Sequence, residues 1–310
     1  MATRNDISSI KAILAKAKWS QTRLARELGV SFITVNRWVN GHASPQPTQR
    51  KAIQRLYQAL VGIEPVAKED LQNVLREVAA RKKKFPGVAK YLQQERIIEE
   101  FLLELTYHSD AIEGSTFTRK ETEAVIFDKA VIKGKSLTEH IEAVNHAAIL
   151  RDIFGGKIRA PVTEETILVL HKALMQGIRQ DAGCYAQTQR GIRGVELALP
   201  APEDIPEEMG RLCRELNVFR GEPISHIARM HADFEAVHPF GDGNGRVGRL
   251  IMVIQLLNSG LAPCVITVNR KAQYYEALEY AQKKSPTHLV RFLAEAVLAG
   301  YAIIGKHSRK

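Results

Sequence analysis

The chain has few of the features that mark a secreted or membrane-spanning protein. Only three cysteines occur among 310 residues, and Cys184, Cys213 and Cys264 form no C-x-x-C pair. An odd number of widely spaced cysteines argues against a disulfide framework or a zinc site, and favours reduced thiols in the cytoplasm. No apolar run reaches the about 20 residues of a membrane span, and the N-terminus lacks the apolar core of a signal peptide. We therefore expect a cytoplasmic protein without a membrane partner.

Acidic residues are almost absent from the first 60 residues, which hold ten Lys or Arg but only Asp6 and Glu27. This segment carries a net charge of +8 out of +10 for the whole chain. A basic segment on a nearly neutral body is typical of a nucleic-acid-binding module. The alternative is a solubilising basic tail, but such a tail has few apolar residues, unlike this segment.

Strand signals are also few, so we expect an all-α fold. Beyond residue 88 the apolar spacing predicts helices at 91–109, 119–128, 137–153, 163–178, 203–219, 222–236, 246–259, 270–283 and 286–304. A small hairpin at 188–199 and an extended piece at 262–269 are the predicted exceptions. A chain of this length favours two domains. The expected division is an N-terminal domain at 1–45, a helical linker at 46–87 and a second domain at 88–310.

The sequence from Trp19 to Gly41 has the pattern of two short helices joined by a tight turn. Gly29 permits the left-handed turn, and Ser31 is a good N-cap for the second helix. Residues 8–45 resemble the helix-turn-helix of phage-repressor-type regulators. This implies DNA binding by a recognition helix in the major groove; a protein-binding module of three helices is the alternative. The expected contacts are Gln21 and Arg23 with phosphates, and Ser31, Phe32, Thr34, Asn36 and Arg37 with the groove.

A glycine-rich loop, HPFGDGNG, precedes an apolar segment that is predicted to be a buried helix. A helix N-terminus presents free N–H groups and the positive end of the helix dipole, which together bind anions. Gly243 and Gly245 let a ligand approach the backbone closely. Arg246 and Arg249 add two cations on the first turn of the helix. The loop is therefore predicted to bind phosphate.

The motif H-P-F-x-D-G-N-G-R-x-x-R at 238–249 resembles the signature of the Fic family, whose members transfer AMP from ATP to protein hydroxyls. Similar segments occur in the same order over about residues 100–300. The resemblance implies an all-helical core with a β-hairpin flap over the active site. It also implies ATP as substrate, Mg²⁺, and an unidentified target protein with a Ser, Thr or Tyr hydroxyl. The chain departs from many members at Ala186, where they have Arg.

The residues of the motif suit this chemistry. His238 is the loop group able to take up a proton near pH 7, as a general base must, and Asp242 is the kind of oxygen ligand that Mg²⁺ prefers. The backbone of the loop and the side chain of Asn244 are expected to hold the α-phosphate. By resemblance, Tyr274 and Tyr275 lie beside the nucleotide, with core packing as the alternative. The predicted ATP-binding set is Asp242, Gly243, Asn244, Gly245, Arg246, Arg249, Tyr274, Tyr275 and Gln282.

Upstream, the spacing of Ser109, Glu113 and Gly114 resembles the inhibitory motif that Fic proteins carry on a helix, here expected at about 100–114. A carboxylate near Arg249 would pair with it in a bidentate manner, and would deny that cation to the γ-phosphate. A plain helix C-cap at Gly114 is the alternative, and both can hold together.

These features predict an adenylyltransferase that Glu113 inhibits in cis and that also binds DNA through residues 1–45. One alternative is a transcription regulator that responds to nucleotide. Another is removal of AMP, or a different nucleotidyl transfer, on the same fold; Gly245 favours AMP, because kinase-type motifs carry Lys there. A homo-oligomer is compatible with the sequence, which names neither the target protein nor the operator.

Overall fold

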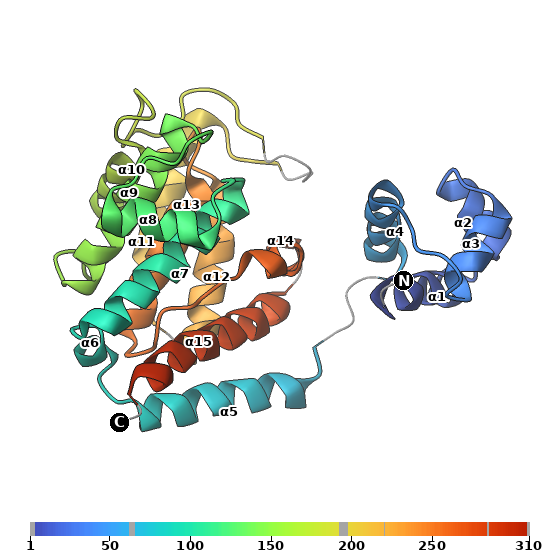
Figure 1. The fold of residues 1–310 in the computed structure, drawn as a ribbon, viewed down its shortest axis with the longest axis horizontal. Helices are drawn as coiled ribbons and strands as arrows, with labels where there is room; N and C mark the ends of the chain where they lie inside the picture. Colours follow the sequence, from blue (N-terminus) through green and yellow to red (C-terminus); the bar gives the residue numbers. More distant parts are fainter. Residues whose placement is uncertain (1–3, 62–65, 192–197, 220, 284, 309–310) are drawn as a thin grey trace. The chain divides into compact units, whose positions relative to one another are not determined.

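The computed structural model describes residues 4–61, 66–191, 198–219, 221–283 and 285–308. The chain divides into two compact units, Met1–Pro65 and Val66–Lys310. Every regular element among the described residues is a helix, which confirms the all-α prediction (Figure 1).

The first unit contains the predicted helix-turn-helix. Its helices are α1 (Arg4–Lys16), α2 (Gln21–Glu27), α3 (Phe32–Val39) and α4 (Pro47–Leu60). Ser31 caps α3 by accepting from the backbone N–H of Thr34 at 3.2 Å. Gly29 has a φ of 64°, the left-handed conformation that the tight turn was predicted to need. The inward side chains Val35 and Trp38 are buried, as their spacing predicts.

The expected linker at 46–87 is divided between the two units. Helix α4 belongs to the first unit, where Ile53 is buried in the same cluster as Leu24 and Trp38. Helix α5 (Lys68–Lys84) belongs to the second unit, where Val78 is buried. The Pro-rich stretch at 44–49 therefore connects two helices that share a core, rather than two domains.

The second unit is built around two antiparallel neighbours, α12 and α13, which flank the glycine-rich loop (Figure 1). Its helices from α7 onward lie within a few residues of their predicted bounds, and α6, which has only four residues and no periodic pattern, was not predicted. The helices are α5, α6 (Val88–Tyr91), α7 (Glu95–Glu113), α8 (Arg119–Asp128), α9 (Leu137–Phe154), α10 (Glu164–Met175), α11 (Ile205–Leu216), α12 (Pro223–Val237), α13 (Asn244–Asn258), α14 (Lys271–Lys283) and α15 (Thr287–His307).

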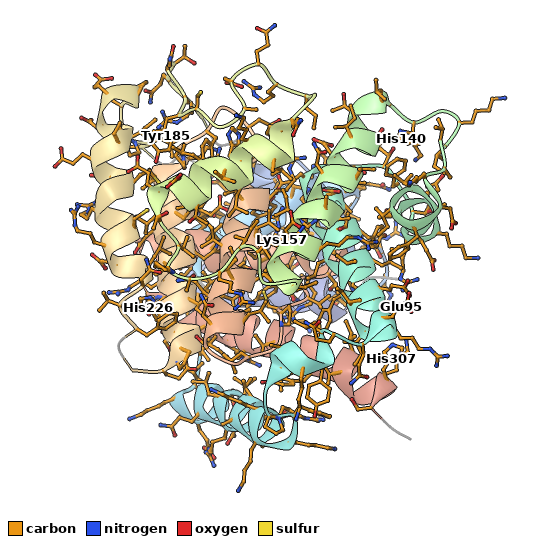
Figure 2. All side chains as sticks on the ribbon, turned by 90° about the vertical axis from the view of Figure 1, so that its left-hand side faces the viewer. Glu95, His140, Lys157, Tyr185, His226 and His307 are labelled. Carbon is orange, nitrogen blue, oxygen red and sulfur yellow. The ribbon has the colours of Figure 1, made fainter. Side chains whose placement is uncertain are left out.

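Helix α15 is long and apolar enough to cross a membrane by length and composition alone. Most of it is instead buried within the second unit, where it packs against α5, α7, α12 and α14. Figure 2 shows its end, marked by His307, beside the start of α7, marked by Glu95. There Lys306 donates to Glu100 at 2.9 Å, which ties the two helices together.

The predicted hairpin at 188–199 falls largely on residues 192–197, which lie outside the described residues. Its described parts, 188–191 and 198–199, contain no strand. The segment at 262–269 is extended and continues into a short 3-10 turn, η2 (Val268–Arg270). One of its backbone N–H groups, that of Val265, donates to Ala296 of α15 at 3.0 Å.

Candidate active site and DNA-binding face

The glycine-rich loop is shaped by two left-handed residues. Helix α12 ends at Val237, and His238 turns the chain with φ 49° and ψ 58°. A positive φ is uncommon for a residue with a side chain and marks a position held by its surroundings. Gly243 has a φ of 80° at the start of α13, and no side chain caps this helix. The first N–H groups of α13 are therefore open to a ligand.

Asn244 closes the loop and does not point toward a ligand. Its Oδ1 accepts from the backbone N–H of Phe240 at 2.9 Å, and its Nδ2 donates to the carbonyl of Phe240 at 2.8 Å. The side chain is buried. The prediction that it holds the α-phosphate is therefore wrong for the side chain, which is used by the loop itself. Only the backbone N–H of Asn244 is placed to serve a ligand.

His171 of α10 packs against the loop and holds it by a hydrogen bond, a role that the sequence did not reveal. The N–H of Gly183 donates to its Nδ1 at 2.9 Å, so the other ring nitrogen, Nε2, carries the proton and donates to the carbonyl of Asp242 at 3.2 Å. Its ring stacks on Phe240 with centroids 3.7 Å apart. Burial lowers the pKa of His171 to about 4, which keeps this single tautomer neutral.

His238, the first residue after α12, carries a neutral imidazole. Burial lowers its pKa below the ordinary value, and the nearby positive charge of Arg190 lowers it further, although Glu235 acts in the opposite direction. Arg190 lies in the segment that precedes the undescribed residues, and its NH2 donates to the carbonyl of Pro200 at 2.8 Å. A neutral imidazole is the form that can accept a proton.

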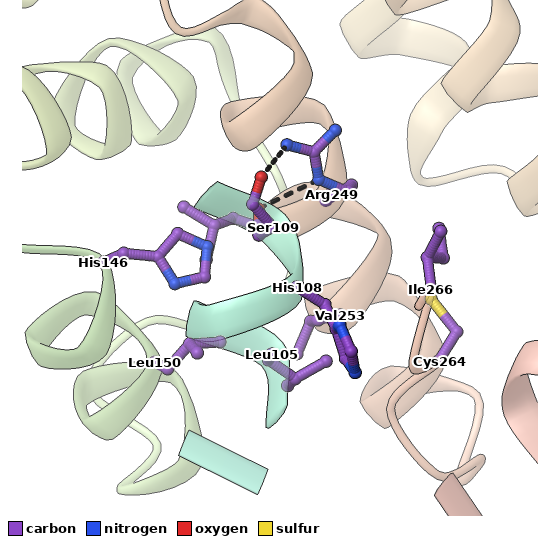
Figure 3. A pocket seen from close by; sticks show the side chains of 10 residues that line it. Leu105, His108, Ser109, His146, Leu150, Arg249, Val253, Cys264 and Ile266 are labelled. Carbon is purple, nitrogen blue, oxygen red and sulfur yellow. Dashed lines mark hydrogen bonds between the residues drawn. The ribbon is translucent and has the colours of Figure 1, made fainter. Parts of the chain in front are cut away.

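Arg249 on α13 is held by the end of α7, as Figure 3 shows for Ser109. Its Nε donates to Ser109 Oγ at 2.9 Å, and its NH2 donates to the carbonyl of Ser109 at 3.1 Å and to Glu113 Oε1 at 2.7 Å. The pairing with Glu113 is therefore single and not bidentate, because Ser109 takes the Nε. A narrow cavity lies behind this contact, lined mainly by apolar side chains and by His108 and His146 (Figure 3).

The carboxylate of Glu113 lies directly over Gly245. A Cβ placed on Gly245 would come within 2.4 Å of Glu113 Oε1 and 3.0 Å of Arg249 NH1. Burial raises the pKa of Glu113, but the attraction of Arg249 outweighs it and holds the pKa below its usual value. An ionised carboxylate thus occupies the first turn of α13, where the sequence predicts phosphate. Gly114 ends α7 with a φ of 117°, so the cap and the ion pair occur together.

Arg246, predicted to grip the outer phosphates, is buried among carboxylates. Its NH1 donates to Glu142 Oε1 of α9 at 2.5 Å, and its NH2 lies 3.5 Å from Asp242 Oδ1. Burial works to lower the pKa of Arg246, but the attraction of Glu142 outweighs it and raises the pKa. A guanidinium already balanced by two carboxylates holds α9 and the loop together. Arg249 is the motif cation that faces the phosphate cradle, by which we mean the backbone of residues 243–245 and the first N–H groups of α13.

Asp242 is the exposed carboxylate of the loop. Its Oδ1 accepts from the N–H of Gly243 at 2.6 Å, and its side chain is 53% exposed. Among the described residues no group of three or more His, Cys, Asp or Glu could hold a metal by itself. Magnesium commonly uses one or two carboxylates together with substrate phosphates and water. One exposed carboxylate beside a phosphate cradle fits an ion of that kind.

Two buried carboxyl groups behind the motif carry little negative charge. Burial raises the pKa of Asp110 to about 7 and that of Glu235 to about 8. Glu235 is thus mostly protonated at neutral pH, and Asp110 is partly protonated. The two carboxyl groups therefore offset the positive field of Arg249 and of the α13 N-terminus less than two ionised carboxylates would.

The three residues predicted beside the nucleotide are placed differently from one another. Tyr274 is fully buried, and its hydroxyl is bonded to His231 Nε2 at 2.6 Å, so it belongs to the core rather than to a nucleotide site. Tyr275 is exposed on α14. Gln282 is half buried, and its Nε2 donates to the carbonyl of Ala232 on α12 at 3.4 Å.

The predicted DNA-binding residues gather on α2 and α3. Arg23, Ser31, Phe32 and Arg37 are exposed, whereas Gln21, Thr34 and Asn36 are half buried. Asn36 Nδ2 donates to Gln21 Oε1 at 3.1 Å, so these two amides join the two helices. The guanidinium of Arg23 lies over the ring of Trp19, 4.5 Å from its centroid. Ile33, which the sequence analysis did not single out, is also exposed here.

Comparison with known proteins agrees with both units. Residues 161–256 match the Fic/DOC family, and residues 10–58 match a helix-turn-helix family, which extends through most of α4. The chain is 29% identical over 263 residues to "Protein adenylyltransferase Fic" of Nematostella vectensis, covering 82% of this chain and 60% of that protein. It is 30% identical over 205 residues to the protein of the same name from Drosophila grimshawi, covering 64% and 42%.

Two solved structures share the fold. Fic-1 from C. elegans gives a TM-score of 0.67 at 25% identity, over 92% of this chain and 85% of that one. A Fic family protein from Desulfovibrio desulfuricans G20 gives a TM-score of 0.67 at 25% identity, over 79% and 77%. The fold thus defines an all-helical domain that follows a helix-turn-helix. The chain carries a Fic/DOC domain at residues 161–256, and it spans about half the length of the curated relatives it matches.

Proposed function

We propose that the protein is a cytoplasmic adenylyltransferase that transfers AMP from ATP to a hydroxyl of a target protein, and that Glu113 inhibits it in cis. One observation carries this proposal. The carboxylate of Glu113 is bonded to Arg249 at 2.7 Å and lies over Gly245, in the cradle that a phosphate needs. The names of the relatives, each a protein adenylyltransferase, support AMP as the transferred group.

The reaction needs one proton acceptor and one anion cradle. The neutral imidazole of His238 takes the proton from the target hydroxyl as its oxygen attacks the α-phosphorus. A new P–O bond forms to the target, the bond from the α-phosphorus to the bridging oxygen breaks, and pyrophosphate leaves. The first N–H groups of α13 stabilise the charge on the α-phosphate oxygens. Asp242 would hold a Mg²⁺ ion, which neutralises phosphate charge when bound.

Inhibition follows from competition for the cradle. Arg249 NH2 is bonded to Glu113, and its NH1 lies 3.0 Å from where a Cβ of Gly245 would be. A γ-phosphate that needs Arg249 must displace an ionised carboxylate from a mostly buried guanidinium. Two negative groups cannot share this position, because like charges at close range repel strongly. ATP is therefore excluded from the productive pose until the end of α7 moves.

We further propose that the first unit binds DNA. Residues 1–60 carry a net charge of +8 out of +10 for the whole chain, and the sequence of this unit matches a helix-turn-helix family. Such a charge supplies the salt-dependent attraction to phosphates. Arg23 and Arg37 are exposed on the two helices of the motif. A regulator that uses this unit to control transcription is compatible with the enzymatic proposal, because the two sites lie in different units.

Labelled ATP tests the enzymatic proposal. We expect wild-type protein to transfer little label from α-labelled ATP to proteins of a cell lysate, and Glu113→Gly protein to transfer at least tenfold more, because the cradle is then open. Glu99→Gly is the matched control, since it makes the same change at an exposed position of α7. Glu113→Gly combined with His238→Ala should transfer no label.

The position of the label separates the alternative reactions. Transfer from γ-labelled ATP would indicate a kinase, and loss of label from previously modified protein would indicate AMP removal. If Glu113→Gly protein that is folded by circular dichroism transfers nothing from either ATP in the presence of Mg²⁺, the proposed activity is wrong.

A further inference from the structure

Two large apolar side chains stand exposed at the start of α3. Phe32 is 48% exposed and Ile33 is 68% exposed. The other apolar anchors of the same helix, Val35 and Trp38, are buried and hold it to the core. Helix α3 therefore buries one set of apolar side chains in the core of the unit and exposes a second set, Phe32 and Ile33, to solvent. Adjacent exposed apolar side chains of this size usually mark a contact surface.

The polar side chains next to them are bonded within the unit. Ser31 Oγ caps the helix and lies 2.9 Å from Thr34 Oγ1. Asn36 Nδ2 donates to Gln21 Oε1, and Asn36 Oδ1 accepts from Asn40 Nδ2 at 3.1 Å. An amide reads adenine when both its donor and its acceptor are available. In Asn36 one N–H and the amide oxygen are already engaged in hydrogen bonds within the unit.

The charge of the unit decides what covers this surface. Ten Lys or Arg and two acidic residues over the first 60 positions favour a polyanion over a second copy of the same basic unit. Ile33 and the exposed Arg37 are four residues apart and share a helix face. In the major groove the apolar group available to a side chain is the 5-methyl group of thymine, and Arg recognises guanine.

We propose that Phe32 and Ile33 recognise thymine 5-methyl groups in the major groove, beside a guanine that Arg37 contacts. This inference rests on the proposed DNA binding of the first unit. It adds a chemical specificity: the half-site contains adjacent thymines next to a guanine, and the thymines are distinguished by their methyl groups. Ile33 becomes a specificity-determining residue.

Removal of single methyl groups tests this inference. The full-length protein is first used to select its preferred duplex from a random pool. Each thymine of that duplex is then replaced by deoxyuridine, which lacks only the 5-methyl group. We expect about a fourfold loss of affinity per contacted methyl, since burying one such group is worth about 0.8 kcal/mol and about 1.4 kcal/mol is a factor of ten.

Two variants connect the effect to the residues. Ile33→Ala and Phe32→Ala should each bind the thymine and deoxyuridine duplexes with more nearly equal affinity. Arg23→Ala is the control: a phosphate contact weakens binding to both duplexes by the same factor and leaves their ratio unchanged. Circular dichroism of each variant verifies the fold.

The failures are distinguishable. If the selection yields no preferred sequence and binding is absent at physiological salt, the proposed DNA binding itself is wrong. If one sequence is preferred but no deoxyuridine replacement weakens binding, only the methyl recognition is overturned. If Ile33→Ala abolishes self-association in sedimentation and leaves the thymine preference intact, the surface is an interface between copies, and the inference is again overturned.

Discussion

The guanidinium of Arg249 makes three hydrogen bonds, and all of them go to the last two turns of α7. Its NH1 has no hydrogen-bond partner among the described residues, and it lies 3.0 Å from where a Cβ of Gly245 would be. Arg249 NH1 is thus the nitrogen left for a phosphate once Glu113 has moved away. A buried charged donor without a partner costs free energy, so an anion that satisfies NH1 is stabilised here.

Ser109 should contribute to inhibition as well as Glu113. Ser109→Ala removes the acceptor of Arg249 Nε and leaves the bond to the Ser109 carbonyl and the pairing with Glu113 in place. Hydrogen bonds to charged groups contribute about 1.5–3 kcal/mol. We therefore expect about tenfold more AMP transfer than in wild-type protein, but less than in Glu113→Gly protein, measured with α-labelled ATP.

Ser115→Ala is the control for this variant, because Ser115 lies two residues beyond α7 and its Oγ accepts from the backbone N–H of Phe117 instead of from Arg249. Transfer by Ser109→Ala protein that equals the wild-type rate would show that Ser109 only packs against α13. A rate below wild type would show that Arg249, once freed from Ser109, pairs more tightly with Glu113.

The acidic limit of the reaction should depend on Arg190. The base must be neutral, and the pKa of His238 lies below its ordinary value, so transfer by Glu113→Gly protein should begin to decline at a lower pH than an ordinary imidazole would impose. The decline should follow the protonation of His238. Arg190→Gln removes a positive charge that lowers this pKa, so the decline should begin at a higher pH.

The measurement is the pH profile of kcat/KM in the Glu113→Gly background. Arg151→Gln on α9 is the control, because Arg151 is not among the residues that shift the pKa of His238. An unchanged profile in the Arg190 variant, with lower activity at every pH, would assign Arg190 to the folding of its segment instead.

At the residue scale the sequence predicted the loop well and its supports poorly. His238, Asp242 and Arg249 are recognisable because fixed spacing within one short segment reveals them. His171 and Glu142 are 67 and 96 positions before His238 in the chain, and each has an ordinary helical context. Their contacts with Asp242 and Arg246 depend on how α9 and α10 pack against α13, which no local pattern encodes. The same is true of Tyr274, which was predicted beside the nucleotide but is buried in the core.

At the scale of elements, the site depends on where three helices end. Helix α12 ends at Val237, α13 begins at Asn244, and the end of α7 lies over that beginning. Two of these ends have a local cause in the left-handed Gly243 and Gly114, whereas the surroundings hold His238 in its left-handed conformation. Helix bounds were therefore predictable to within a few residues, because turn residues and periodicity are local. The contact between α7 and α13 was suggested by a family resemblance and not by either helix alone.

The helix α4 was misplaced for the opposite reason. The Pro-rich stretch before it looks like a linker, whereas only the burial of Ile53 shows that α4 completes the first core. We expect the fragment 1–65 to be folded and the fragment 1–45 to be unfolded, because the latter exposes Ile10, Ile13 and Trp38. Domains of so few residues bury little apolar surface, so the loss of one helix removes a large share of their stability.

Far-ultraviolet circular dichroism during heating checks this pair of fragments. A cooperative transition in 1–65 and none in 1–45 is the expected result. A cooperative transition in both would show that α4 only covers a core that is already sufficient.

At the scale of the whole molecule, the described residues of each unit have a main hydrophobic core of their own. The cluster around Leu24, Val35 and Trp38 shares no residue with the large cluster of the second unit. Cores that share no residue can melt independently, and a chain of this kind then departs from two-state unfolding. DNA binding and AMP transfer should accordingly be separable by substitutions inside either core.

Trp38→Ala is the sharpest such substitution. Trp38 is 3% exposed, and truncation of a buried Trp costs about 3–5 kcal/mol, a large share of the stability of a small domain. In the Glu113→Gly background we expect calorimetry to show two transitions, of which Trp38→Ala removes the smaller together with DNA binding. AMP transfer and the larger transition should stay unchanged. Phe234→Ala in the second core is the converse control, which lowers the larger transition and spares DNA binding. If Trp38→Ala shifts both transitions or lowers AMP transfer, the two units are energetically coupled, and occupancy of the DNA would then be able to regulate the Glu113–Arg249 contact.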